Sequence, residues 1–436
     1  MKFFRIINSK YYSGIQIPQY IGIKGEKVLT DKNLLLKEYE DWCKKGLNLD
    51  MSRGKPGKEQ LALSEGMLGV IGAGEDVVCE NGLDCRNYGC LDGIPEAKAL
   101  FSSLLGIPQE NLFIGGNSSL NMMFDTVSRC MLFGVYGGKE PWSKQGKIKF
   151  LCPSPGYDRH FAICEAMGIE MIPVEMNEDG PDMDTVEQYV NKDAAVKGIW
   201  CVPKFSNPSG YTYSDETVRR FARLKPATDD FRIFWDNAYA IHEIYDCEVK
   251  LLDIFDEAKK YGNEDLIFYF ASTSKITFPG SGVALMAASE NNLKQMLPYI
   301  SAQTIGYDKI NQMRHVKYFG DADGVKKHMK LHADVIRPRF EAVIEAFRKN
   351  LCGIANWTEP GGGYFIDLCV KDGCAKKVYD LCAGAGVKLT KVGAVYPYGK
   401  DPRDCHLRIA PTYPDIEDLK TAAEILCLCV KLSSVE

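Results

Sequence analysis

The sequence predicts an α/β fold in which a mainly parallel sheet is covered by helices. From about residue 110 to 290, short apolar runs such as IKFLCPS, GIWCVP and FRIFWD alternate with polar or amphipathic stretches. The runs are apolar almost throughout, which is typical of strands that are buried on both faces. Buried strands that alternate with helices indicate a parallel sheet with helices on both sides.

Seven apolar runs define the expected sheet. In chain order they are NLFIGG, IKFLCPS, IEMIPVEM, GIWCVP, FRIFWD, LIFYFAS and GVALMAAS. The connection after the first run has apolar residues at helical spacing, namely Leu120, Met123, Phe124 and Val127. This spacing predicts a helix there. We therefore expect a large domain built on a seven-stranded sheet.

A smaller α+β domain is expected beside the large one. Residues 324–351 have apolar positions at helical spacing and predict a long helix. After it, TEPGGGYFIDLCV and CHLRIAPTY predict further strands, with a helical stretch between them. We expect residues 66–324 to form the large domain, and residues 23–65 together with 325–436 to form the small domain. Residues 1–22 are expected to be a loose N-terminal tail.

The composition is that of an ordinary globular protein. Of the 436 residues, 45% are hydrophobic and 25% charged, and the formal net charge is −5. A negative balance argues against nucleic acid or an anionic membrane surface as a partner. No apolar run approaches the ~20 residues of a membrane span, and the N-terminus has no continuous apolar segment of the signal-peptide type. We expect a protein without a membrane partner.

The cysteines and histidines predict neither disulfides nor a metal site. The 16 cysteines are scattered, mostly inside apolar runs, which in a chain this long favours reduced thiols in the cytoplasm. Cys85 and Cys90 lack the close spacing of a zinc knuckle. His328 and His332 stand four residues apart on the predicted long helix, but no third ligand is evident. We expect this pair to lie on a solvated helix face.

Lys275 is the first candidate functional residue. It follows the apolar run LIFYFAS within a cluster of hydroxyl residues, STSKIT. Lysines normally lie on the surface as hydrated cations. A lysine whose amine is kept partly dry loses its proton more easily and becomes a nucleophile toward carbonyls. The position of Lys275 therefore predicts carbonyl chemistry.

Further polar residues follow the other predicted strands. Asn117, Ser118 and Ser119 open a helix after FIGG, and the amides at a helix N-terminus suit a phosphate. A plain N-cap would use the same residue types. Asn207 follows GIWCVP, and the stretch 236–239, DNAY, ends the run FRIFWD. Because ligands bind at the carboxyl ends of parallel strands, we expect these residues to share one site.

The motifs FIGGNSS, SNPSG, DNAY, STSK and HLRIAP, in this order, resemble those of the class I/II aminotransferases. These are pyridoxal-phosphate (PLP) enzymes of fold type I. The stretches MSRGKPGKEQL, RNYGCLDGIPEAK and YDKINQMRHV are most similar to the MocR-like subgroup, also called type Ic aspartate aminotransferases. The resemblance covers nearly the whole chain from about residue 47.

The resemblance implies roles for the residues at the strand ends. Lys275 matches the lysine that condenses with the cofactor's aldehyde. Asp236 matches the carboxylate that keeps the ring nitrogen protonated, so that the ring withdraws electrons. Tyr239 and Asn207 match groups that bind the phenolic oxygen. Ser272 matches a phosphate-binding serine, beside residues 117–119.

Four further positions are carried over from the family. Tyr157 is the nearest candidate for the aromatic residue that stacks on the cofactor ring. Tyr88 matches a tyrosine that reaches the phosphate in the partner subunit, which implies a homodimer with shared active sites. Arg408 matches the arginine that binds the substrate α-carboxylate, for which a planar fork of donors is suited. Gly54 matches the position where an N-terminal segment closes over that carboxylate.

Two positions depart from the family pattern. Relatives place an arginine for the phosphate in a G-x-R-x-G run after the lysine, whereas this chain has PGSGVAL. Arg53, Lys55 and Arg86 are the candidate replacements. No arginine for a substrate side-chain carboxylate is evident, and Arg53, Lys55 and Arg314 are the candidates.

The implied activity is transamination in amino acid metabolism, with aspartate and 2-oxoglutarate as the expected substrates of a ping-pong mechanism. Lys275, once freed, would move a proton from Cα as general base and acid. Another reaction of the same fold, as in a β-lyase or an aspartate β-decarboxylase, is the alternative. A DNA-binding regulator is not expected, because only about 45 residues precede the first motif.

Overall fold

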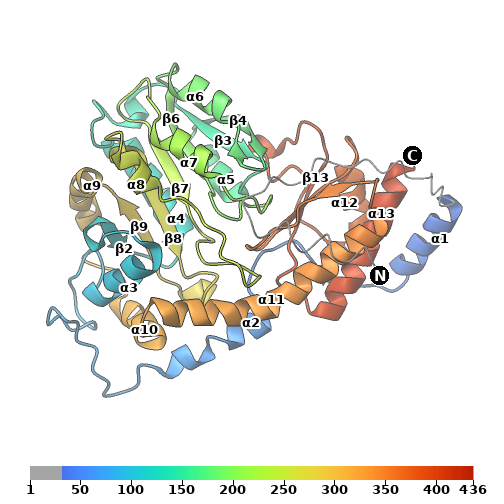
Figure 1. Ribbon diagram of the computed structural model, residues 1–436, viewed down its shortest axis with the longest axis horizontal. Coiled ribbons are helices and arrows are strands. Elements are labelled where there is room, and N and C mark those ends of the chain that lie inside the picture. The colour runs from blue at the N-terminus through green and yellow to red at the C-terminus, as the bar shows by residue number, and fades with distance from the viewer. Residues whose placement is uncertain (1–31, 436) are drawn as a thin grey trace.

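The computed structural model describes residues 32–435, which form two lobes (Figure 1). The large lobe is built on an eight-stranded sheet and the small lobe on a three-stranded sheet. The predicted tail, residues 1–22, and the start of the segment 23–65 lie outside the described residues. Among the residues described, no helix is long and apolar enough to cross a membrane.

The sheet of the large lobe is mainly parallel, as predicted. Its strands, in spatial order, are β2 (Leu112–Ile114), β9 (Ala284–Ala288), β8 (Ile267–Ser272), β7 (Arg232–Asp236), β6 (Val196–Cys201), β3 (Lys149–Ser154), β4 (Glu170–Asn177) and β5 (Gly180–Pro181). The pairs within β8-β7-β6-β3-β4 are parallel, and β9 and β5 run antiparallel to their neighbours.

The sheet has one strand more than the seven predicted. The additional strand is β5, a two-residue edge strand that forms a hairpin with β4. It consists of Gly180 and Pro181, and proline cannot donate a ladder hydrogen bond. Neither residue type signals a strand, so sequence periodicity could not indicate it.

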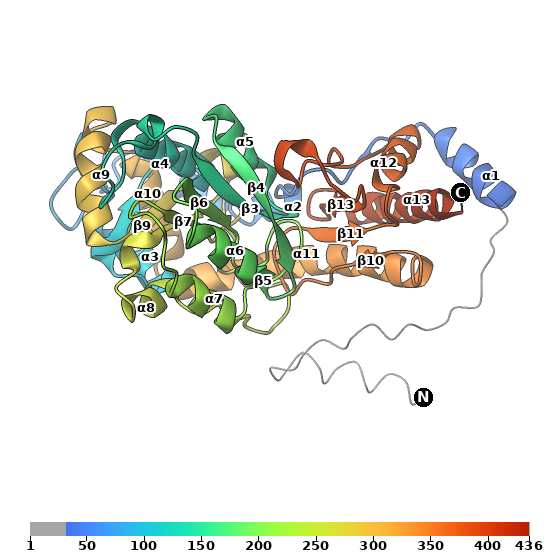
Figure 2. The ribbon, with the colours of Figure 1, turned by 90° about the horizontal axis from the view of Figure 1, so that it is seen from above.

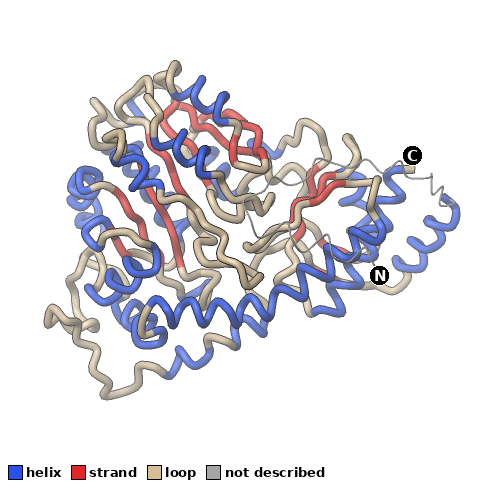
Figure 3. The backbone as a smooth tube through the Cα atoms, in the orientation of Figure 1, coloured by secondary structure: helices blue, strands red, loops and turns tan. Residues whose placement is uncertain are grey.

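Helices cover both faces of the eight-stranded sheet (Figures 2 and 3). On one face, apolar residues of the strands pack against α4 (Ser119–Phe133), α5 (Asp158–Ala166) and α9 (Glu290–Gln303). The opposite face packs against α3 (Pro95–Leu105), α6 (Met183–Val190), α7 (Asp215–Ala222), α8 (Ile254–Lys259) and α10 (Lys309–Phe319). Alternate strand residues serve the two faces, as in Phe234 on the first face and Trp235 on the second.

The small lobe has its own apolar core. An antiparallel sheet of β10 (Asn356–Trp357), β11 (Ile366–Cys369) and β13 (His406–Ile409) packs with α12 (Ala375–Gly384) and α13 (Ile416–Ser434). The N-terminal part of the chain adds α1 (Lys32–Cys43), α2 (Lys58–Ala62) and β1 (Leu49–Asp50), which pairs in parallel with β12 (Val387–Lys388). Residues from both ends of the chain thus meet here.

One helix connects the lobes. Helix α11 (Ala322–Asn350) runs along both of them (Figure 1). Near its start, Val325 and Met329 pack against the large-lobe residues Leu100 and Ile276. Its C-terminal half, including Phe340, lies in the core of the small lobe. The helix thus packs into the cores of both lobes.

Candidate active site

The carboxyl ends of β3, β6, β7 and β8 lie at one edge of the sheet, because these strands are parallel neighbours. Strand β7 ends at Asp236, and β8 ends at Ser272, three residues before Lys275. Asn207 follows β6 and Tyr157 follows β3. The sheet therefore brings together the residues that the sequence placed after its strands.

Lys275 lies in a turn after β8 and is partly buried. Its Nζ lies over the ring of Tyr239, 4.3 Å from the centroid. Burial lowers the pKa of the Lys275 amine below its ordinary value, although Tyr157 and Asp236 act in the opposite direction. At a given pH, more of the amine is therefore neutral than in an exposed lysine, as a nucleophile or base requires.

Asp236 is a buried carboxylate with one oxygen available. Its Oδ2 forms a hydrogen bond with His160 Nε2 at 3.0 Å. His160 stacks on Trp200 at 4.5 Å between ring centroids. Oδ1 is buried and has no hydrogen-bond partner among the described residues. A buried acceptor without a partner is costly, so Oδ1 fits a cationic N–H donor such as a protonated pyridine ring.

Tyr239 and Asn207 supply two more polar groups. The hydroxyl of Tyr239 is buried and has no partner within the described part of the chain. Burial raises the pKa of this phenol far above its ordinary value, with Asp236 acting in the same direction. It therefore stays an O–H donor, suited to an anionic oxygen. Asn207 is buried, and its Oδ1 accepts from Arg408 Nη1 at 3.4 Å.

Tyr157 lies beside this group. Its ring contacts that of His160 edge to face, with 4.9 Å between centroids. Burial raises the pKa of Tyr157 to about 12, although Lys275 lowers it. Tyr157 is thus close enough to Lys275 and Asp236 for their charges to act on its hydroxyl.

Hydroxyl groups and backbone amides gather at the start of α4. Ser118 caps this helix by accepting from Asn121 N at 3.3 Å. Ser274 Oγ donates to the carbonyl of Asn117 at 3.4 Å and receives a hydrogen bond from Ser272 Oγ at 3.0 Å. A Cβ on Gly282 would lie only 2.8 Å from that carbonyl, so only glycine allows this approach. A helix N-terminus with adjacent hydroxyls fits a phosphate.

The cation expected beside the phosphate is not identified. Arg86 pairs with Asp84 at 2.5 Å on an exposed loop. Lys55 lies over the ring of Tyr413, 3.7 Å from the centroid, and Arg53 is exposed. Arg314 Nη1 donates to Asn311 on its own helix at 3.4 Å. None of these four cations has a contact to Lys275, Asp236 or Ser272 among those described.

Arg408 stands on β13 of the small lobe and is 9% exposed. Its Nη1 lies 2.7 Å from Asp158 Oδ1, and its guanidinium carbon lies 5.0 Å from the centroid of the Phe365 ring. A Cβ on Gly54 would lie 2.3 Å from that ring. Glycine thus lets the segment 51–57 pass over Phe365, where Met51 O accepts from Ala410 N at 3.0 Å.

Tyr88 stands apart from the rest of the chain's own site. Its side chain is 75% exposed. It follows the loop of Arg86 and Asp84 and precedes α3. The Tyr88 ring thus lies on the surface of the chain.

Two residues of the site were missed as functional candidates. His160 contacts Asp236, and Asp158 contacts Arg408. Both follow Tyr157 at the start of α5. Their signal in the sequence is the spacing, because residues within the first helical turn after a strand end face the same edge of the sheet.

The expectation of a solvated helix face for His328 and His332 is wrong. Both are buried, at 6% and 1% exposure. His328 Nε2 lies 2.9 Å from the carbonyl of Ile276, next to Lys275, and His332 Nδ1 lies 3.2 Å from Gln60 Nε2. The large lobe and α2 cover this face of α11, and periodicity within one helix does not reveal such packing.

A third buried histidine holds the lysine turn. His315 Nε2 lies 3.0 Å from the hydroxyls of both Thr273 and Thr277. Burial lowers the pKa of His315 to about 4. Burial also lowers the pKa of His332 to about 3, with His328 acting in the same direction. Both imidazoles are thus neutral when folded near neutral pH.

These two depressed values predict acid sensitivity. As pH falls below the ordinary histidine value of 6.5, the unfolded chain binds protons that folded His315 and His332 do not bind until about pH 4 and 3. The unfolding free energy should therefore fall between these limits, by on the order of a few kcal/mol. Denaturant titrations between about pH 7 and 5 measure this. His315→Gln should make the unfolding free energy depend less steeply on pH. An unchanged slope in that variant would show that His315 does not have the depressed pKa.

Comparisons with known proteins agree with this architecture. Residues 27–436 match the family model of aspartate amino-transferase. An aspartate aminotransferase of Corynebacterium glutamicum is 44% identical over 402 residues, which are 92% of this chain and 93% of that protein. A solved structure of an aspartate transaminase from the same species superposes with a TM-score of 0.90 at 43% identity, over 92% of this chain and 95% of that one.

More distant structures share the fold. An α-aminoadipate aminotransferase from Thermus thermophilus, solved with N-(5'-phosphopyridoxyl)-L-leucine, has a TM-score of 0.72 at 19% identity. The superposition covers 92% of this chain and 96% of that one. The molecule bound there joins a phosphopyridoxyl group to an amino acid.

Proposed function

This chain belongs to the aspartate aminotransferase family, whose members are PLP-dependent transaminases, and we propose that it transfers the amino group of aspartate to 2-oxoglutarate. The observation that carries the proposal is the pair of unpartnered buried atoms, Asp236 Oδ1 and Tyr239 OH, beside the partly dry amine of Lys275. This donor and acceptor set suits the ring nitrogen and the phenolic oxygen of PLP.

The roles of the residues follow from their environment. Bound PLP supplies an electron sink that makes the Cα–H of an amino acid acidic. Lys275 Nζ would hold the cofactor and then accept and return the Cα proton as a general base and acid. Asp236 Oδ1 would accept from the ring N–H, while His160 fixes Oδ2. Tyr239 and Asn207 would donate to the phenolic oxygen, and Tyr157 would lie against the ring.

The phosphate and the substrate would occupy opposite ends of the site. Residues 117–119 and Ser272 would bind the phosphate, using amides and hydroxyls in place of the family's arginine. Arg408 would bind the α-carboxylate, under the segment that contains Gly54. Because the amino acid and the 2-oxo acid share this carboxylate, both half-reactions of a ping-pong cycle would use Arg408 in turn.

Aspartate as donor is supported by the name of the C. glutamicum relative at 44% identity. The exposed ring of Tyr88 supports a homodimer in which this tyrosine reaches the partner's site.

All 16 cysteines are free, which supports a reducing compartment such as the cytoplasm. Residues 66–324 would form the cofactor-binding domain and residues 23–65 with 325–436 the small domain.

A panel of half-reactions tests the substrate. PLP-loaded protein is mixed with one amino acid at a time, and the absorption spectrum and the products are measured. Aspartate should give one equivalent of oxaloacetate and a bleached cofactor band, and 2-oxoglutarate should restore the band. Pyruvate with ammonia from a cysteine conjugate would indicate a β-lyase. Alanine with CO₂ from aspartate would indicate a β-decarboxylase, and either result would overturn the proposal.

The contact between Asp158 and Arg408 predicts an effect on substrate affinity. Asp158 occupies Nη1 of Arg408 with a carboxylate at 2.7 Å, so it competes with the substrate's α-carboxylate. Asp158→Asn should lower the KM for aspartate by about two- to fivefold, the range expected for a partly exposed ion pair. The control is Asp184→Asn on α6, which breaks a more exposed pair with Arg220 on α7, away from Arg408. A KM that rises in Asp158→Asn would show that Asp158 assists binding.

A further inference from the structure

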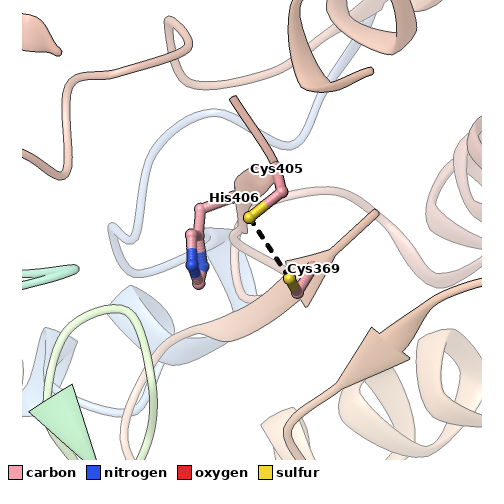
Figure 4. Close-up of side chains that lie close together, drawn as sticks. All are labelled: Cys369, Cys405 and His406. Carbon is pink, nitrogen blue, oxygen red and sulfur yellow. Dashed lines mark hydrogen bonds between the residues drawn. The ribbon is translucent and has the colours of Figure 1, made fainter. Parts of the chain in front are cut away.

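The small lobe holds a cluster of three side chains that the proposed reaction does not use. Cys369 lies at the end of β11, His406 is the first residue of β13, and Cys405 directly precedes it (Figure 4). The two strands are antiparallel, and Cys369 stands directly opposite His406. One sulfur or nitrogen atom from each of the three residues lies within 4.8 Å of the other two. Cys369 is far from the other two residues in the sequence, and the pairing of β11 with β13 brings them together.

The donor atoms are those that thiophilic metals prefer. The two sulfur atoms lie 3.4 Å apart and form no disulfide. Two thiolates and one imidazole are a known set of protein ligands for a tetrahedral zinc ion, with the fourth position left to solvent. Cys405 is fully buried and Cys369 only partly, so the cluster has a protein-enclosed side and an accessible side.

A buried carboxylate orients the imidazole. Asp367 Oδ2 lies 2.8 Å from His406 Nδ1. The other oxygen, Oδ1, is buried without a hydrogen-bond partner in the described part of the chain. A carboxylate that holds a histidine ring is the usual companion of a metal-binding imidazole. A cation close by would also offset the charge of Asp367. The nearby Arg403 is paired with Asp372 at 2.8 Å, which offsets the charge of Arg403.

We propose that Cys369, Cys405 and His406 bind one thiophilic divalent cation of the Zn²⁺ type. Binding replaces the protons on the two sulfurs and on the ligating ring nitrogen of His406, all of which pass to solvent, by two metal–sulfur bonds and one metal–nitrogen bond. No electron is transferred. The ion would crosslink β11 to β13, the strand that also carries Arg408 two residues after His406.

Cobalt(II) tests the proposal in the PLP-loaded, fully reduced enzyme. Tetrahedral Co²⁺ with thiolate ligands has intense d–d bands at longer wavelengths than the cofactor absorbs. Titration should produce these bands with an endpoint at one equivalent, and Zn²⁺ should remove them. Cys369→Ser and His406→Asn should lose the endpoint. Asp367→Asn should bind Co²⁺ about 10- to 100-fold more weakly, as expected when the carboxylate partner of a ligand is lost.

The chain provides a matched control. Cys79 and Cys85 form a second thiol pair, with 3.3 Å between the sulfurs but no histidine in a metal-binding group with them among the described residues. The double variant C79S/C85S should keep the full Co²⁺ signal. A signal that persists in Cys369→Ser, or that disappears in C79S/C85S, would overturn the proposal, as would the absence of tetrahedral bands in the wild type.

A measurement on the wild type guards against variants that fail to fold. Zn²⁺ should protect the partly exposed Cys369 from alkylation, as mapped on peptides, by at least about tenfold in rate. Cys352 is exposed and outside the cluster, so its alkylation should not change. Equal alkylation of Cys369 with and without Zn²⁺ would also refute the site.

Discussion

Replacing Lys275 with alanine is expected to lower multiple-turnover transamination by about 10⁴-fold, the upper range for a positioned acid–base group. The amine lies over Tyr239, and burial lowers its pKa. When Lys275 is removed, no other amine contacts Tyr239 among the described residues. The steady-state formation of the 2-oxo acid measures the loss. PLP should still bind, because Asp236 and the start of α4 remain.

The control for this variant is a second buried lysine. Lys197 lies at the amino end of β6 and pairs with Asp230 at 2.6 Å, away from the carboxyl edge of the sheet. Lys197→Met should reduce stability without a comparable loss of rate. Borohydride treatment of the PLP-loaded wild type should label the peptide that contains Lys275. A label on any other lysine, or full turnover by Lys275→Ala, would contradict the assignment.

Asp236→Asn should have the second largest effect. The substitution keeps the shape of the side chain but removes the negative charge that would face the ring nitrogen. Losing one partner of a buried ion pair costs about 3–5 kcal/mol. If this cost falls on the transition state, kcat/KM should drop by about 10²- to 10⁴-fold. The pH dependence of the cofactor spectrum should shift as well, because the ring nitrogen then loses its proton more easily.

Asp230→Asn separates this effect from a loss of folding. Asp230 is also buried, and it lies just before the opposite end of the same strand, β7, where it pairs with Lys197. Its replacement should lower the melting temperature and leave kcat/KM within about twofold, as expected for a site away from the chemistry. Equal rate losses in Asp230→Asn and Asp236→Asn would mean that the charge of Asp236 has only a structural role.

The sequence was sufficient to predict which residues of the candidate site meet at the carboxyl edge of the large sheet. Asp236, Asn207 and Lys275 each follow an apolar run, and parallel strands bring such positions to a common edge whatever their separation in the chain. The mainly parallel architecture followed from the same runs. These features depend on local pattern and on a general rule of topology, so they could be predicted without coordinates.

Other features depend on packing between distant elements. His328 and His332 are buried because the large lobe covers their face of α11, and no periodicity within the helix signals this. Cys369 and Cys405 meet through the register of β11 and β13, and a shift of one residue would separate them. The contact of Asp158 with Arg408 joins the two lobes. Each of these required the tertiary structure.

Helix α11 joins the turn of Lys275 to the core of the small lobe. Toward its start, His328 is hydrogen-bonded beside the lysine turn, and toward its end, Phe340 is anchored in the core of the small lobe. Pro338 lies between these anchors and cannot donate the backbone hydrogen bond expected at its position. The α11 helix is therefore weakest at Pro338. Bending of α11 would therefore be easiest near Pro338, close to where the helix enters the core of the small lobe at Ile336.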